Sequence, residues 1–192
     1  VLAVMAAHFI LGPIGWKIGE WISAFVMAGI SGNFRVLFGA VFGLLYAPLV
    51  ITGLHHMSNA IDLQLIQSTG GTMLWPMIAL SNIAQGSSVL AMSVLQKKNA
   101  KAQEVNIPSM ISCYLGVTEP AMFGVNLKYH FPFYCAMIGS AVAGIISTGL
   151  GVQAASIGVG GLPGIISIFP QFMAIFAIAM LVAIVVPFVL TY

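Results

Sequence analysis

The sequence predicts an all-α membrane protein, a polytopic helical bundle with re-entrant hairpins. Of its 192 residues, 60% are hydrophobic and 5% are charged, and the mean hydropathy is +1.06, whereas a soluble domain carries about 25% charged residues. Uncharged runs cover residues 36–54, 63–96 and 131–192. A helix that crosses a ~30 Å hydrocarbon core needs about 20 apolar residues. A soluble fold has no place for an uncharged run of 62 residues.

The first 34 residues are predicted to hold a partial span followed by an interfacial helix. Residues 1–16 are apolar and are interrupted by Gly12-Pro13, while 17–30 mix Lys17 and Glu20 with apolar residues, which is typical of a helix at the headgroup level. The chain starts inside an apolar run without Met or a signal-like region, so we expect a piece of a longer polytopic protein.

Residues 35–192 are predicted to form one domain with four spans and three re-entrant segments. The spans are expected at about 36–54, 72–96, 132–150 and 171–192. The first has 19 uncharged residues, about 28 Å of helix at ~1.5 Å per residue. The segments at about 55–71, 105–131 and 151–164 are short, half apolar and interrupted by Gly or Pro. Such irregular backbone is tolerated at membrane depth only where protein or a water-filled cavity satisfies it.

The hydrophilic stretch Gln96–Glu104 sets the expected orientation. It holds three lysines within five residues, which places it on the cytoplasmic side. Counting the predicted spans and re-entrant segments back from this loop puts Arg35 on the cytoplasmic side too. The 55–71 segment would enter from outside and the 105–131 segment from the cytoplasm. If both reach mid-membrane, the histidines of the first meet Glu119 of the second.

Glu119 is the first candidate functional residue. It lies in GVTEP, from Gly116 to Pro120. A residue before proline avoids the helical region and proline has no N–H to donate, so the motif predicts a break between two half-helices. A carboxylate at membrane depth usually faces a cavity and a functional partner, and the second half-helix would favour its charge. A purely structural cap is the alternative, although Asp, Asn or Ser would cap equally well.

The tandem pair His55 and His56 is the second candidate. It opens a stripe with Ser58, Asn59 and Asp62 on one face of a helix, which should look into a cavity or at another helix. A lone histidine is more often a packing residue, but a pair on a polar stripe favours a site. Whether Asp62 stays neutral, holds a histidine tautomer or pairs with a cation is left open.

A third polar row lies inside the 72–96 span. It consists of Ser81, Asn82, Gln85 and Ser88. Neutral amides and hydroxyls at this spacing suit a hydroxyl-rich ligand and equally suit contacts between membrane helices. Trp75 can stack on a sugar face, although an interfacial position is expected.

Several function classes lack their motifs. There is no HExxH, GxSxG or Walker A pattern and no carboxylate cluster for a divalent metal, so no metal, cofactor or nucleic acid is expected. Cys113 and Cys135 lack the spacing of a metal site or disulfide framework and are expected to be packing residues. The remaining polar residues suit a small polyhydroxylated solute.

Three stretches closely resemble the membrane-embedded enzyme IIC component of the bacterial phosphoenolpyruvate-dependent sugar phosphotransferase system. They are GLHHMSNAIDLQLIQSTGGTMLWPMIALSNIAQGSSVL, IPSMISCYLGVTEPAMFGVNLKYHFPF and SIGVGGLPGIISI. The resemblance is to the glucose superfamily, most nearly its trehalose-specific branch. It implies the mobile transport half of a homodimeric permease in the bacterial inner membrane, without the scaffold half and the IIB domain.

The resemblance also implies a reaction and its residues. An external disaccharide, by implication trehalose, would be carried inward and phosphorylated to the sugar 6-phosphate by a phosphocysteine on IIB. Glu119 would orient or deprotonate the 6-hydroxyl, and His56 would assist the transferring phosphoryl group. The expected sugar contacts are His55, His56, Asn59, Asp62, Asn82, Gln85, Thr118 and Glu119. This chain alone should phosphorylate nothing.

Two other function classes stay open from the residues. In a proton-coupled secondary sugar transporter, Glu119 and Asp62 would relay protons and no phosphoryl group would move. In a membrane receptor or scaffold, Glu119→Gln would leave function intact.

Overall fold

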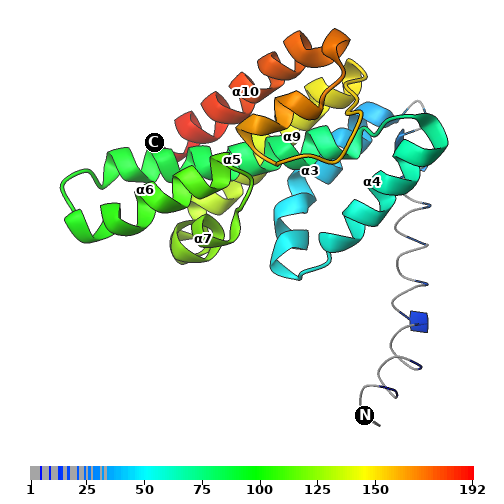
Figure 1. Ribbon diagram of the computed structural model, residues 1–192. Coiled ribbons are helices and arrows are strands. Elements are labelled where there is room, and N and C mark those ends of the chain that lie inside the picture. Colours follow the sequence, from blue (N-terminus) through cyan, green and yellow to red (C-terminus); the bar gives the residue numbers. More distant parts are fainter. Residues whose placement is uncertain are drawn as a thin grey trace.

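The computed structural model describes residues 34–192 without a gap, and before them residues 5, 9, 13, 14, 17, 21, 24, 26, 28–30 and 32. The predicted partial span at 1–16 and most of the interfacial helix at 17–30 therefore lie outside the described residues. The described part is helical and holds no β-strand, only two isolated bridges (Figure 1). The predicted all-α membrane class is confirmed.

The helices of the described part follow one another along the chain. They are α3 (Arg35–Ile51), α4 (His56–Thr69), α5 (Leu74–Leu95), α6 (Ala100–Tyr114), α7 (Glu119–Ala121), a π-helix (Met122–Asn126), α8 (Leu127–Tyr129), α9 (Phe131–Gly149), two 3₁₀ turns (Leu162–Ser167 and Pro170–Phe172) and α10 (Met173–Thr191). Within the described residues, three stretches are long and apolar enough to cross a membrane: α5, α9 and Pro170–Thr191. They correspond to three of the four predicted spans.

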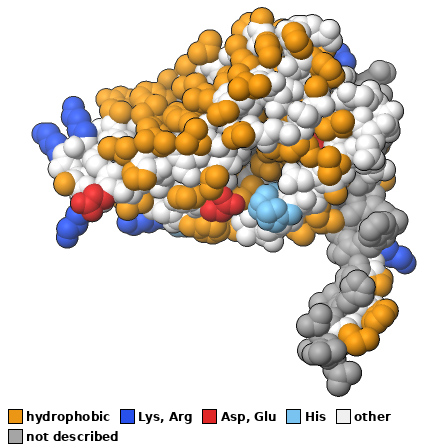
Figure 2. Space-filling model, viewed as in Figure 1, with side chains coloured by type: hydrophobic (Ala, Val, Ile, Leu, Met, Phe, Trp, Pro, Cys, Tyr) orange, Lys and Arg blue, Asp and Glu red, His pale blue; other side chains and the backbone are white. Residues whose placement is uncertain are grey.

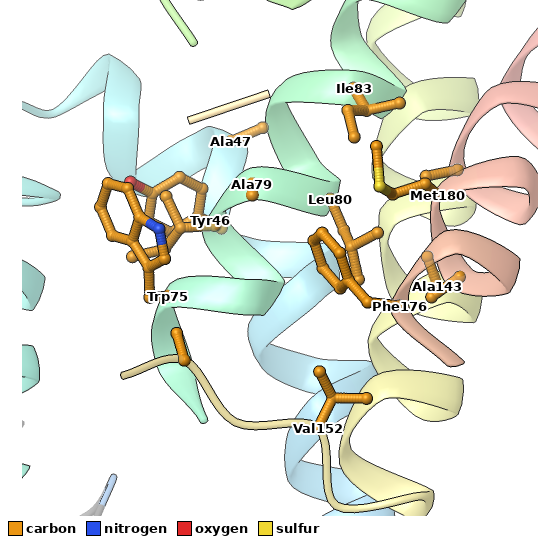
Figure 3. Packing of buried hydrophobic residues seen from close by; sticks show 14 of the residues in the cluster. Tyr46, Ala47, Trp75, Ala79, Leu80, Ile83, Ala143, Val152, Phe176 and Met180 are labelled. Carbon is orange, nitrogen blue, oxygen red and sulfur yellow. The ribbon is translucent and has the colours of Figure 1, made fainter. Parts of the chain in front are cut away.

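Helix α5 is the central element of the bundle. Its residues are buried almost without interruption from Leu74 to Val89, and it packs against α9, α10, α6 and α3. A helix that is apolar or neutral on every side is stable only when it is surrounded. Figure 3 shows the core on one side of it, where Leu80 meets Phe176 and Met180 of α10.

Glycines let the neighbouring helices approach closely. A Cβ atom added to Gly43 of α3 would lie 2.6 Å from the Ser140 carbonyl oxygen of α9, and one added to Gly39 would lie 2.6 Å from that of Gly144. Contacts of small residues are typical of helix pairs in membranes, where close backbone approach supplies the packing energy. Because residue 39 meets 144 while residue 43 meets 140, α3 and α9 run antiparallel.

The start of α3 lies at the opposite end of α9 from the lysines. The Arg35 guanidinium donates a hydrogen bond to the Gly149 carbonyl at 3.2 Å, at the last residue of α9. Lys128 precedes the first turn of α9 and shares a cavity lining with Asn99 and Lys101. Nineteen residues of helix, about 28 Å, separate the two ends, so the prediction that Arg35 shares the lysine side is wrong.

The reason is that α3 is one arm of a hairpin whose second arm is α4. The chain turns after Ile51 and returns as α4 (Figure 1). Thr72, just beyond α4, exchanges backbone hydrogen bonds of 2.9 and 2.8 Å with Ala154, five residues after the end of α9. The α3–α4 hairpin therefore opens at the Gly149 end and has its tip around His55.

A second hairpin opens at the lysine end. Helix α6 starts at Ala100, five residues before the predicted segment, because the Asn99 side chain caps it and accepts a hydrogen bond from the Ala102 N–H at 3.2 Å. The link between α5 and α6 is thus only residues 96–99. The chain turns at 115–118 and returns through α7, the π-helix and α8. The π-helix was not predicted.

Residues 151–164 form the third segment between spans, and it is largely non-helical. Ala154 pairs with Thr72 on one side and with Ile168 on the other. The irregular path continues past the predicted end at 164 through two 3₁₀ turns to Phe172.

Candidate functional site

The tips of the two hairpins meet at a cavity of about 160 Å³. Its lining comes from α3, α4, α5, the GVTEP break and the 151–164 segment. The lining residues are Tyr46, Val50, His55, His56, Asn59, Trp75, Ile78, Asn82, Gly116, Thr118, Glu119 and Gly160. Six of the eight predicted site residues are therefore brought together. In Figure 2 a histidine patch and an acidic side chain lie next to each other beside a hollow.

Glu119 begins a helical arm at the edge of the cavity. It is the first residue of α7 and Pro120 is the second, a position where proline loses no hydrogen bond. Gly116 supplies the turn with φ +99°. The Met122 N–H donates to the Thr118 carbonyl at 2.8 Å, which starts the arm. Thr118 is buried, whereas the Glu119 side chain is exposed toward the cavity and beyond it.

The two histidines have different surroundings. His55 precedes the first turn of α4 and is half-buried, with an Nδ1 atom that has no hydrogen-bond partner. Burial first, and then the neighbouring His56, lower the pKa of His55, which favours the neutral imidazole. The His56 ring is exposed, with its centroid 4.0 Å from that of His55. His56 is thus the histidine with a free edge toward a ligand.

Asn82 connects the central helix to the break before Glu119. Its Nδ2 atom donates a hydrogen bond to the Gly116 carbonyl at 3.2 Å, and the residue also lines the cavity. Asn82 is only 6% exposed, so this bond is protected from water. The side chain therefore holds the GVTEP turn against α5.

Asp62 and Gln85, both predicted to bind substrate, lie outside the cavity lining. The Asp62 carboxylate is fully buried and accepts hydrogen bonds from the Thr72 hydroxyl and from the Trp75 N–H at 3.1 Å. It ties α4 to the start of α5. Burial raises the pKa of Asp62 to about 6, against the effect of these two hydrogen bonds.

Gln85 serves a contact between helices. Its side-chain oxygen accepts a hydrogen bond from Asn126 Nδ2 at 2.6 Å, and Ser88 Oγ donates to Asn126 Oδ1 at 3.1 Å. Asn126 is fully buried in the π-helix. The polar row of α5 is thus divided: Asn82 faces the cavity, and the next turn holds the returning arm of the hairpin.

Several wall residues were not predicted as site residues. Tyr46 and Trp75 contribute aromatic rings from α3 and α5 (Figure 3), and Gly160 contributes bare backbone. The sequence favours an interfacial position for Trp75 over stacking on a sugar, but Trp75 is only 7% exposed and its Nε1 atom is buried without a partner. Nothing in the local pattern distinguished Tyr46, Val50 or Ile78 from other apolar residues of a span.

The surroundings of the cavity suit a neutral, hydroxyl-rich ligand. A neighbouring crevice of about 190 Å³ between α3 and α4 shares Tyr46 and His55 but has otherwise almost wholly apolar walls, so it offers few groups to orient a sugar. Among the residues that the structure describes, no three His, Cys, Asp or Glu side chains form a group that could hold a metal ion. The cavity combines one carboxylate that can accept a proton, two imidazoles, amides and aromatic walls.

Comparison of the sequence with known proteins shows to which family the chain is similar. The family model described as "Phosphotransferase system, EIIC" matches residues 1–140. The chain is 54% identical, over its whole length, to the PTS system trehalose-specific EIIBC component of Escherichia coli (strain K12) and 50% identical to that of Bacillus subtilis (strain 168). It is 42% identical, over 97% of its length, to the sucrose-specific EIIBC component of Pasteurella multocida (strain Pm70).

The chain spans only 40 to 41% of the length of these relatives. No solved structure matches it. The family match covers nearly three quarters of the chain and includes both motifs that line the cavity. The chain therefore belongs to the EIIC family of the phosphotransferase system.

Proposed function

We propose that this chain is the sugar-carrying part of a trehalose permease of the phosphotransferase system in the bacterial inner membrane. It would import the disaccharide and deliver it as the sugar 6-phosphate. The observation that carries the proposal is the shared cavity, to which His56 comes on one hairpin and Glu119 on another from the opposite end of the bundle. The names of the two trehalose-specific relatives support the substrate.

In the proposed reaction the sugar lies against Tyr46 and Trp75 with its reacting hydroxyl at Glu119. The hydroxyl oxygen attacks phosphorus, the S–P bond of a phosphocysteine breaks, and the thiolate leaves with the electron pair. The hydroxyl proton passes to the Glu119 carboxylate. His56 contacts the oxygens of the transferring group. Such transfers depend mainly on positioning and electrostatic stabilisation, so a short set of polar groups suffices.

The phosphocysteine would come from a IIB domain outside this chain. The relatives are named EIIBC components and are more than twice as long as the chain. Cys113 is fully buried in the core and Cys135 donates a hydrogen bond to the Leu190 carbonyl, so neither is placed to carry the phosphoryl group. We expect the chain alone to be inactive in phosphorylation.

We further propose that the complete protein is a homodimer embedded in lipid. The apolar side chains that α10 exposes support the second part: Ile178, Leu181, Val185 and Val189 are each more than half exposed. An uncharged surface of this kind is stable in hydrocarbon and not in water.

The decisive experiment uses the complete permease in inverted vesicles with the soluble phosphotransferase components. We expect trehalose phosphate to form when phosphoenolpyruvate is supplied, and to form equally after the proton gradient is dissipated. Sucrose, offered at the same concentration, should be phosphorylated more slowly. Uptake of unmodified sugar that stops with the gradient would instead identify a proton-coupled transporter.

A further inference from the structure

The glycine-rich part of the 151–164 segment touches the backbone of the GVTEP break. A Cβ atom added to Gly116 would lie 2.8 Å from both the N and the Cα of Gly160. Real Cβ atoms do not approach backbone this closely, so the two segments of the chain touch only because both positions lack a side chain. Gly160 also lines the cavity. The third segment between spans thus forms one side of the candidate site.

The Asn82 side chain lies next to both Gly116 and Gly160. Its amide donates to the Gly116 carbonyl at 3.2 Å. A Cβ atom added to Gly160 would overlap the Asn82 Nδ2 atom and would lie 3.2 Å from the Gly116 Cα. There is accordingly no room at residue 160 for a methyl group unless Asn82 or the GVTEP turn moves.

The backbone of Gly160 does not itself require glycine. Gly116 and Gly161 have φ +99° and +68°, but Gly160 is not among the glycines with positive φ. An alanine there adds a contact without forcing a strained backbone. The effect of Gly160→Ala can therefore be attributed to the contact of residue 160 with Asn82 and Gly116, and not to a strained backbone.

We propose that Gly160 is a positioning residue for Glu119 in the phosphoryl transfer, a proposal that rests on the function proposed above. Gly160 and Asn82 hold the Gly116 turn from two sides, and the turn leads through Thr118 directly into Glu119. A shift of the turn would displace the carboxylate from the sugar hydroxyl. A misplacement of 1 Å costs a reaction on the order of 100-fold, whereas sugar contacts made from α3 and α4 would persist.

The test is Gly160→Ala in the complete permease. We expect the turnover of trehalose phosphorylation to fall roughly 10- to 100-fold, while the dissociation constant for trehalose rises less than about threefold, which is under ~0.7 kcal/mol. The matched control is Gly149→Ala at the far end of α9, where a Cβ atom would meet, among the described residues, only Val36 Cγ2 at 3.6 Å. This variant should retain wild-type turnover and binding.

A double-mutant cycle that combines Gly160→Ala with Asn82→Ala tests whether both residues act through the Gly116 turn. If the two residues act on the same turn, the loss of turnover in the double variant is smaller than the product of the single losses. The proposal is overturned if Gly160→Ala behaves like Gly149→Ala. It is also overturned if binding, turnover and the unfolding midpoint in detergent fall together. An inactive wild type would instead overturn the proposed function, and this proposal with it.

Discussion

The Arg35 guanidinium donates a hydrogen bond to the carbonyl of Gly149, and this contact marks the end of α9 at which the α3–α4 hairpin begins. Because Gly149 ends α9 and the lysines lie at its other end, the two hairpins enter the bundle from opposite ends and meet at their tips. The histidines and the GVTEP motif, more than 50 residues apart, thereby line one cavity. The site depends on how far each hairpin reaches as well as on which residues it carries.

The opposed hairpins predict the accessibility of two single cysteines. In cysteine-free permease, Arg35→Cys should react with a membrane-impermeant maleimide added outside the cell. Lys98→Cys should react only in inverted vesicles. The reason is the separation of the two ends of α9 by about 28 Å of helix. Labelling of both from the same side would contradict the arrangement.

Glu119→Gln should abolish trehalose phosphorylation and weaken binding only a few-fold. The amide keeps the size and one hydrogen-bond acceptor of the side chain but cannot take a proton from the hydroxyl. General-base catalysis contributes typically 10²- to 10⁴-fold, so we expect a loss in this range in single-turnover measurements with phosphorylated IIB. Retained phosphorylation would remove Glu119 from the mechanism.

The two histidines should differ when each is changed to alanine. His56→Ala should reduce turnover and leave the unfolding midpoint in detergent unchanged, because its ring is exposed. His55→Ala should lower the midpoint as well, since this ring is half-buried. Thermal unfolding and phosphorylation assays on the same preparations check both statements, and equal effects would contradict the division of roles.

Asp62 should make stability depend on pH. Its pKa is raised from 3.8 to about 6, so the folded state holds the proton more tightly than the unfolded state. The contribution of this group is therefore fully present below about pH 4 and is lost as the pH rises toward 6 and beyond. Asp62→Asn should remove this part of the dependence and raise the midpoint at pH 8 relative to wild type.

Asp62→Ala provides the comparison. It deletes the acceptor of the Thr72 hydroxyl and the Trp75 N–H and should destabilise the protein at pH 5 and at pH 8 alike. A wild-type midpoint that does not fall relative to Asp62→Asn between these pH values would contradict the prediction.

Asn126→Ala should destabilise the returning arm of the second hairpin. The substitution leaves the buried side-chain oxygen of Gln85 and the Ser88 hydroxyl without one of their partners. A buried polar group without a partner costs about 1–3 kcal/mol. We expect a clearly lower unfolding midpoint, whereas Gln64→Ala, which removes an exposed amide from α4, should have almost no effect.

The amino-acid sequence by itself determined the membrane class, three spans and the break at GVTEP. These features follow from local free energies: an uncharged run of about 20 residues favours hydrocarbon wherever it occurs, and Glu119-Pro120 disfavours a continuous helix in any context. The histidine pair and Glu119 could also be named as site residues from the sequence, because polar groups are costly in such an apolar chain. The histidine pair, Asn59 and Glu119 lie on short polar stretches of an otherwise apolar chain, and Asn82 lies on a polar row inside a span.

Only the tertiary structure decided which member of each polar row faces the cavity. Asn59 and Asp62 are one turn apart on α4, yet the first lines the cavity and the second is enclosed against α5. Asn82 and Gln85 differ in the same way. Helical spacing specifies a face, but the crossing of neighbouring helices divides that face between contact and cavity. An apolar run such as α3 likewise suits a crossing or one arm of a hairpin. Here Arg35 contacts Gly149 and Thr72 pairs with Ala154, so the chain leaves and returns at the same end of α9 and α3 is one arm of a hairpin.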